Sequence, residues 1–219
     1  QVGQNSGSEE AVFLIFSTGT VFLAPFVFTV PPPESYGFLW ICLLAGLVYT
    51  VQTVFYIKAL SRGEASLVAP VYYFGLFFLL FLTTVFLDES LDALKILGIV
   101  LLIYGMSFLN RKQHILHSIK AVLKDRACQF MTLSSLLVAV GRTIDGFMVR
   151  TVHPIIYTFS LCIATLIFLF IHLLLTRRLG AAGKLFRQKL RIGATAGAVD
   201  CYSYLLLMFA ITRIEVSIA

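Results

Sequence analysis

The carboxylate of Asp200 has the clearest chemical potential of any group in this sequence. It lies nine residues after Arg191, inside an apolar run near the end of the chain. An ionisable side chain in such a run is costly to bury and is by default a candidate functional group. A carboxylate there can bind a cationic group of a ligand or exchange a proton. The alternative role is a hydrogen bond that holds helices together.

The stretch that contains Asp200 repeats an earlier stretch of the chain. Residues 45–68, AGLVYTVQTVFYIKALSRGEASLV, align without a gap with residues 196–219, AGAVDCYSYLLLMFAITRIEVSIA, and share 7 identities in 24 positions. Both copies contain the polar run S/T-R-x-E-x-S, in which Arg, Glu and the last Ser are identical. Apolar segments share Ala and Val by accident far more readily than such a polar run. We interpret the pair as an internal repeat.

The repeat indicates which residues accompany Asp200. It places Tyr49 opposite Asp200, and Gln52 opposite Ser203. Tyr56 lies seven residues after Tyr49 and shares its helix face. A pseudo-twofold axis would bring the two aligned pairs to one locus, with Tyr56 on the same helix face as Tyr49. We therefore predict a substrate-binding site with aromatic walls, an amide and one carboxylate. For Tyr49 and Gln52, structural hydrogen bonding is an equally good interpretation.

Arg142 and Asp145 form a second group of charged residues inside an apolar segment. Their spacing of three residues puts both side chains on one face of a helix, where they can form an ion pair. A neutralised structural pair is the slightly preferred interpretation. The alternative is a gate, or a counter-charge for an anionic substrate.

Several other residues fit structural roles. Glu89 precedes a helical segment, where a carboxylate accepts free backbone N–H groups and interacts favourably with the helix dipole. Pro70 removes a backbone donor and predicts a kink, while Gly98 and Gly105 lie on one helix face and favour close packing. The repeat also carries charges at helix ends, which we expect to cap and pair across short links: Arg62, Glu64, Arg213 and Glu215.

The sequence contains none of the motifs H-E-x-x-H, G-x-S-x-G or the P-loop. Its four cysteines lack metal-ligand spacing, and free thiols packed as small apolar groups are the expected state. We therefore predict that the chain is not an enzyme and has no catalytic residues, no cofactor and no metal site. The net charge of +6 is clustered in a way that favours a membrane surface rather than nucleic acid.

The composition requires lipid as the surrounding solvent. Of 219 residues, 59% are hydrophobic and 13% are charged, with a mean hydropathy of +0.92, whereas soluble domains have about 25% charged residues. After a polar N-terminal segment at 1–10, seven segments are long enough to cross a bilayer, and only helices suit such open-ended spans. The predicted spans are residues 11–30, 38–60, 66–87, 92–110, 128–151, 155–175 and 192–213.

Two basic segments orient these helices. The linker at 111–126 separates spans one to four, within 11–110, from spans five to seven, within 127–219; the link at 176–191 carries six basic residues and no acid. The positive-inside rule places both links on the cytoplasmic side. The two copies of the repeat then lie five helices apart and cross in opposite directions, as in an inverted repeat. A complete pair of five-helix units would need one more helix at the start and two at the end.

A series of motifs runs from Phe55 to Leu109. They are the A-L-S-x-x-x-A-S stretch at 59–66, Pro70, the L-x-E turn at 87–89, Gly98 and Gly105. In this order they resemble the last part of an EamA-type unit of the drug/metabolite transporter superfamily. The resemblance implies a ten-helix carrier built from two inverted five-helix units around a central substrate cavity. It also implies cytoplasmic termini, which would place the linker at 111–126 outside and so disagrees with the charge pattern.

Repeat and resemblance together predict a secondary transporter. It would move a small metabolite, amino acid or amphipathic compound by alternating access, with proton coupling as an option. The alternative is a non-transporting membrane assembly or receptor-like subunit with the same helices. We expect a multi-pass protein of the cell (inner or plasma) membrane whose partners are the lipid bilayer and a small-molecule substrate, without nucleic acid. The sequence leaves homodimer formation open.

Overall fold

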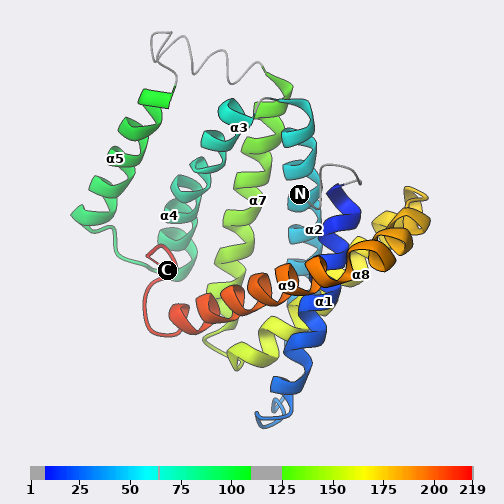
Figure 1. The fold of residues 1–219 in the computed structure, drawn as a ribbon. Helices are drawn as coiled ribbons and strands as arrows, with labels where there is room; N and C mark the ends of the chain where they lie inside the picture. Colours follow the sequence, from blue (N-terminus) through cyan, green and yellow to red (C-terminus); the bar gives the residue numbers. More distant parts are fainter. Residues whose placement is uncertain (1–7, 64, 110–124, 219) are drawn as a thin grey trace. The chain divides into compact units, whose positions relative to one another are not determined.

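The computed structural model describes residues 8–63, 65–109 and 125–218, and these residues form helices without a strand. The prediction of an all-α membrane protein is confirmed. The helices are α1 (Ser8–Val27), α2 (Phe38–Arg62), α3 (Ala65–Tyr72), α4 (Phe74–Leu87), α5 (Ala93–Leu109), α7 (Arg126–Met148), α8 (Pro154–Leu175) and α9 (Leu179–Ile211) (Figure 1).

Six helical stretches of the described residues are long and apolar enough to cross a membrane, so the chain is a multi-pass integral membrane protein. The fourth predicted span corresponds to α5, which is described over 17 residues and is not among the six. The linker predicted at 111–126 lies outside the described residues, apart from its last two positions. The six stretches are Glu9–Val27, Phe38–Arg62, Val68–Leu87, Arg126–Met148, Pro154–Leu175 and Leu179–Ile211.

The third predicted span is broken near its middle. Helix α3 ends at Tyr72 and α4 begins at Phe74, with Tyr73 in a turn between them. The break follows Pro70 by three residues, and the backbone N–H of Tyr73 donates to the Pro70 carbonyl at 3.1 Å. A proline lacks an N–H and crowds the turn that precedes it, whereas Tyr73 follows Pro70, so this local effect does not account for the position of the break.

The basic segment at 176–191 is mostly helical instead of being a simple link. Helix α9 begins at Leu179, and its apolar side chain Leu185 is buried against Leu14 of α1. Apolar residues on one face and basic residues on the other make this part amphipathic, which explains why it folds as a helix. At Lys189 the backbone leaves helical geometry (φ −127°, ψ 22°), so a kink separates the basic part of α9 from its apolar part.

The chain divides into two compact units. Unit 1 comprises residues 1–50, 144–214 and 219, and unit 2 comprises residues 51–143 and 215–218. Within unit 1, α1 packs against both α9 and α8 (Figure 1). Within unit 2, the core gathers apolar residues of α2, α3 and α7: Ala59, Val68, Val71, Ala127, Cys128 and Met131.

Two glycines that are partners in the internal repeat occupy close helix crossings inside unit 1. A Cβ on Gly46 of α2 would lie 2.7 Å from the Ala164 Cβ of α8. A Cβ on Gly197 of α9 would lie 2.8 Å from the backbone nitrogen of Gly19 in α1. Small residues let helix backbones approach in lipid, where van der Waals packing drives helix association. The sequence repeat therefore coincides with a repeated packing feature.

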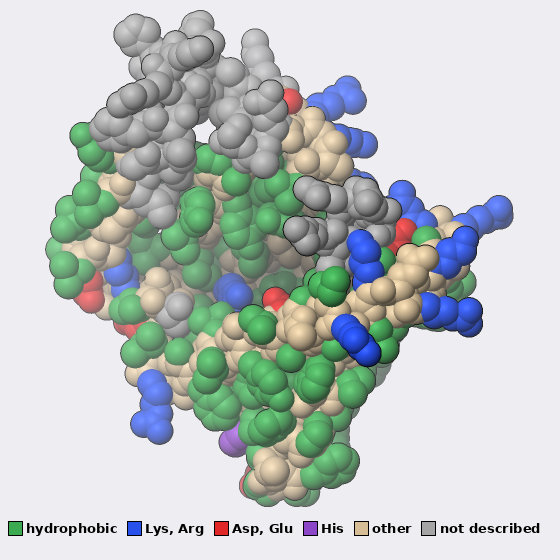
Figure 2. Space-filling model, in the orientation of Figure 1, with side chains coloured by type: hydrophobic (Ala, Val, Ile, Leu, Met, Phe, Trp, Pro, Cys, Tyr) green, Lys and Arg blue, Asp and Glu red, His purple; other side chains and the backbone are tan. Residues whose placement is uncertain are grey.

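Large apolar side chains are exposed on each unit, and hydrophobic side chains cover much of the face shown in Figure 2. Trp40 and Leu206 of unit 1 are 75% and 69% exposed, and Phe86 and Leu94 of unit 2 are 68% and 80% exposed. Such a surface would be unusual in water but is the surface that a bilayer requires.

Candidate functional site

The most deeply buried carboxylate in the described residues of unit 1 is Asp145, near the end of α7. Its side chain is 0% exposed and accepts hydrogen bonds from three tyrosine hydroxyls. Tyr157 donates to Oδ1 at 2.7 Å, while Tyr49 and Tyr204 each donate to Oδ2 at 2.6 Å. We call these four residues the Asp145–tyrosine cluster.

Each member of the cluster comes from a different helix, and local sequence features hold it in place. Tyr49 of α2 follows Gly46, whose small size lets α2 approach α8 closely. Tyr157 lies in the first turn of α8, which begins at Pro154. The cap of that turn is His153, whose side chain accepts a hydrogen bond from the backbone N–H of Ile155 at 3.3 Å. A proline at the first position and a side-chain cap both favour a helix start here.

The geometry of the cluster suits an ionised carboxylate. All three hydroxyls can donate, and a carboxylate accepts up to about four hydrogen bonds. The rings of Tyr49 and Tyr204 meet edge to face with centroids 6.3 Å apart, so aromatic surface lies beside the charge. Tyrosine hydroxyls can also accept, and rotation would let the same three groups surround a protonated acid. The cluster can therefore hold a negative charge, a proton or, after rearrangement, a cationic group.

The structure brings together some of the predicted site residues. The Tyr49 hydroxyl donates a hydrogen bond to Asp145. Tyr49 was predicted to contact substrate, and Asp145 was predicted to form an ion pair or a gate with Arg142. Asp200 and Ser203 lie on an exposed part of α9. Asp200 precedes Tyr204 by four residues, so it lies one helical turn from the cluster along α9.

The remaining predicted substrate contacts belong to unit 2. The side-chain amide of Gln52 donates to the Ser134 hydroxyl at 3.0 Å, and the Tyr56 ring lies edge to face against Tyr72 at 5.5 Å. Arg142 lies on α7 three residues before Asp145, with its side chain half-buried. These contacts are hydrogen bonds and ring packing between helices of one unit.

Two of the residues assigned to structural roles, Glu89 and Glu215, form a polar cluster in unit 2. Glu89, 4% exposed, accepts hydrogen bonds from the backbone N–H groups of Val216 (2.5 Å) and Ser217 (3.1 Å), and it also lies 4.0 Å from the Lys95 ammonium. The donors belong to the segment after α9, not to the helix that Glu89 precedes. Glu215 pairs closely with the same Lys95.

The other residues predicted to have structural roles lie in different environments. The Arg62 guanidinium stacks over the Phe130 ring, 4.9 Å from its centroid, and Arg213 is exposed. A Cβ on Gly98 would meet no atom within 4 Å. Glu64 and the surroundings of Gly105 lie outside the described part of the chain.

The contact between Glu215 and Lys95 gives an expected pH dependence of stability. The hydrogen bond from Lys95 is the main cause that holds the pKa of Glu215 below its ordinary value of 4.5. A carboxylate with a lowered folded-state pKa stabilises the fold above that ordinary value, and this stabilisation is lost as pH falls through the folded-state pKa. Thermal unfolding in detergent between neutral pH and a pH below 4.5 should therefore show a smaller loss of stability for Glu215→Gln than for the unmodified protein. Equal pH slopes in both proteins would count against the contact.

Sequence reasoning missed Tyr157 and Tyr204. Tyr157 lies outside both copies of the repeat, and Tyr204 aligns with Thr53, a different residue type. The available signal was a tyrosine hydroxyl within an apolar segment, as at Tyr157 and Tyr204. A tyrosine hydroxyl needs a hydrogen-bond partner when it is buried, but the sequence does not show which residue that partner is.

Among the described residues, no group of three His, Cys, Asp or Glu side chains is arranged to hold a metal ion. All four cysteines are buried free thiols, as they were expected to be.

One comparison with known proteins identifies the relationship of the chain. The EamA-like transporter family model matches residues 1–111, which is more than half of the sequence. A search of curated proteins found no match. The matched range includes every motif on which the resemblance to this family was based, and the resemblance is confirmed.

Proposed function

The chain belongs to the EamA-like transporter family, and we propose on this basis that it is a secondary transporter that carries amphipathic organic cations or amino acids by alternating access. A membrane transporter role follows from the family itself. The observation that supports the finer proposal is the Asp145 carboxylate, fully buried among three hydroxyls from three other helices. Ionisable groups within membrane spans mark substrate or proton pathways more often than they serve packing alone.

The cluster offers both parts of an amine-binding site. Asp145 supplies the negative charge, and the edge-to-face rings of Tyr49 and Tyr204 supply aromatic surface. A substrate ammonium that entered would exchange hydroxyl hydrogen bonds for an ion pair and cation–π contacts. The tyrosine hydroxyls hold the carboxylate while no cation is bound, so the charge is never left without donors.

Alternating access requires a cluster that can open. The four side chains come from α2, α7, α8 and α9, so a shift of one helix changes the set of donors around the carboxylate. A substrate or a proton would then compensate the released charge, which couples binding to helix movement. Asp200, one turn from Tyr204, is the second carboxylate that we assign to this path.

The architecture that we assign to the carrier is an inverted pair of repeats in the cell (inner or plasma) membrane. The close crossings of α2 with α8 at Gly46 and of α9 with α1 at Gly197 support it, because a two-fold axis that exchanges the repeats would exchange these crossings. Cross-linking in native membranes would test whether homodimers form.

A matched pair of tyrosine variants on α9 tests the proposed site. Uptake of radiolabelled phenylalanine and benzyltrimethylammonium would be measured in proteoliposomes and in empty liposomes. Tyr204→Phe removes a donor to Asp145 and is expected to lower the initial rate about tenfold, in line with loss of one charge-assisted hydrogen bond. Tyr202→Phe removes a hydroxyl that makes a long hydrogen bond, 3.5 Å to the Phe22 carbonyl, and should transport normally.

Uptake of neither compound above the empty liposomes would contradict a carrier of amphipathic amines and amino acids. Equal effects of Tyr204→Phe and Tyr202→Phe would contradict the assigned site.

The alternative function, a non-transporting membrane subunit, is favoured by one feature of the same cluster. Three tyrosine hydroxyls donate to the carboxylate without a ligand, and these hydrogen bonds join four helices. On that interpretation Tyr204→Phe would lower thermal stability while the protein carries neither compound, so stability and uptake measured together separate the two functions.

A further inference from the structure

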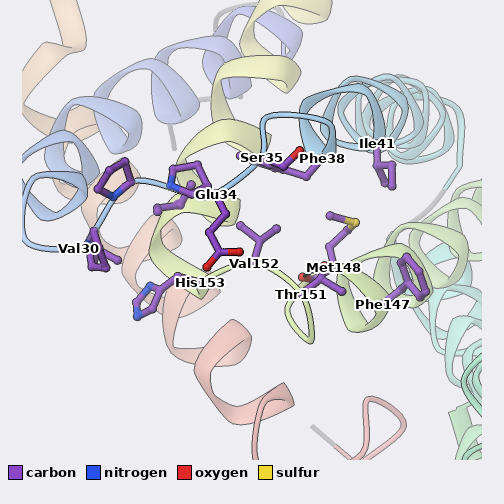
Figure 3. A pocket seen from close by; sticks show the side chains of 14 residues that line it. Val30, Glu34, Ser35, Phe38, Ile41, Phe147, Met148, Thr151, Val152 and His153 are labelled. Carbon is purple, nitrogen blue, oxygen red and sulfur yellow. Dashed lines mark hydrogen bonds between the residues drawn. The ribbon is translucent and has the colours of Figure 1, made fainter.

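A cavity of about 640 Å³ lies in unit 1 where the α1–α2 loop faces the α7–α8 loop (Figure 3). Its size is that of a site for a small organic ligand, which typically occupies about 300–1,000 Å³. One wall is the stiff proline run at 31–33, and aromatic surface comes from Phe38 and Phe147. We call this space the loop cavity.

The loop cavity carries a negative charge without a basic counterpart in its lining. Glu34 lines it, and no lysine or arginine does. Figure 3 shows the Glu34 side chain extending from the α1–α2 loop toward Val152 and His153. The other polar lining groups are the hydroxyls of Ser35 and Thr151 and the His153 ring, which already accepts a backbone N–H through Nδ1. An apolar wall with one carboxylate is complementary to an organic cation that has an apolar body.

Two residues that line the loop cavity are close in sequence to members of the Asp145–tyrosine cluster. Met148 lines the cavity, is 2% exposed and follows Asp145 by one helical turn on α7. On α8, Ile156 lines the cavity, and its neighbour Tyr157 donates to Asp145. The same segments of α7 and α8 therefore contribute both to the cavity lining and to the hydrogen bonds of the buried carboxylate.

We propose that the loop cavity is an entry site that binds a small organic cation through Glu34 before the cation passes Met148 to reach Asp145. The proposal rests on the proposed transport function for the second step, but binding in the cavity does not require transport. Two carboxylates in sequence, Glu34 in the loop cavity and Asp145 in the cluster, would raise the local concentration of cations over anions.

Charge-selective labelling of a cysteine in the loop cavity tests the entry site. Thr151→Cys places a thiol in the lining, and the native cysteines are buried. The full chain in liposomes would be labelled with cationic trimethylammonium-ethyl methanethiosulfonate and with the anionic sulfonatoethyl reagent, each rate divided by that for a free thiol. The cationic reagent should react about tenfold faster, and benzyltrimethylammonium, but not phenylacetate, should slow it.

Two charge-matched variants in this background identify the source of the selectivity. Glu34→Gln should abolish both the preference and the protection, whereas Asp92→Asn, which removes the same charge from a residue that does not line the cavity, should leave both unchanged. Selectivity that persists in Glu34→Gln, or is absent from the parent, would overturn the proposal. Ser35→Cys, another lining position, gives the same test if Thr151→Cys does not fold. Labelling selectivity without uptake would support the entry site and contradict the transport function. Uptake without labelling selectivity would support the transport function and contradict the entry site.

Discussion

Replacing Asp145 with asparagine is expected to lower the initial rate of uptake roughly 100-fold or more. An asparagine has no charge for a cation, and its NH₂ group faces hydroxyls that now donate to a carboxylate oxygen. Hydrogen bonds to a charged group contribute about 1.5–3 kcal/mol each, and a loss of about 3 kcal/mol corresponds to roughly 100-fold. The measurement is the initial rate of benzyltrimethylammonium uptake into proteoliposomes.

The matched control for this experiment is Asp200→Asn. It makes the same chemical change on an exposed part of α9, one turn from Tyr204. If the buried cluster is the main binding site, Asp145→Asn should impair uptake more than Asp200→Asn, and both proteins should remain folded by size-exclusion chromatography. A folded Asp145→Asn protein with normal uptake would remove Asp145 from the mechanism. A larger effect of Asp200→Asn would transfer the central role to that residue, as sequence reasoning alone had assigned it.

Gly46→Leu is expected to destabilise the protein by about 3 kcal/mol or more, because the crossing of α2 and α8 has no room for a side chain. Even a Cβ would lie 2.7 Å from the Ala164 Cβ and 2.8 Å from the Thr165 backbone nitrogen. The backbones would have to separate, and Tyr49, one turn further along α2, would move away from Asp145. The measurement is the thermal unfolding midpoint in detergent, together with the yield of monodisperse protein.

Gly98→Leu is the control for this prediction. It makes the same substitution within helix α5, at a position where a Cβ meets no atom within 4 Å. We expect its stability to differ little from that of the unmodified protein, and Gly46→Ala should fall between the two. Equal stabilities of Gly46→Leu and Gly98→Leu would mean that the α2–α8 crossing is not tightly packed.

Much of the fold follows from the sequence because lipid imposes strong local rules. An apolar stretch of about 20 residues must be helical in a bilayer, so composition alone predicted the all-α membrane protein. The proline rule predicts a kink at Pro70 but not a break at Tyr73, because a proline disturbs the turn that precedes it. The start of α9 was misjudged because the basic charges at 176–191 were given more weight than the apolar side chains between them, which pack on α1.

The candidate site depended on tertiary structure. The position of a carboxylate along a helix can be counted from the sequence, which is how Asp200, nine residues after Arg191, became the leading candidate. Burial also depends on the direction in which the side chain points, and that is fixed by neighbouring helices. The buried face of α9 passes through Gly197 and Cys201, and Asp200 lies beside it and is exposed.

The Asp145–tyrosine cluster illustrates the same physical limit. Its hydrogen bonds join Asp145 to residues 96, 12 and 59 positions away in the chain. Sequence periodicity reports on neighbours within a few turns of one helix, and the repeat reports only on residues that both copies retain. Lipid solvation thus determined the helices of this protein from the sequence. Which carboxylate is buried was decided by the packing of four helices, since only that packing brings three tyrosine hydroxyls to one charge.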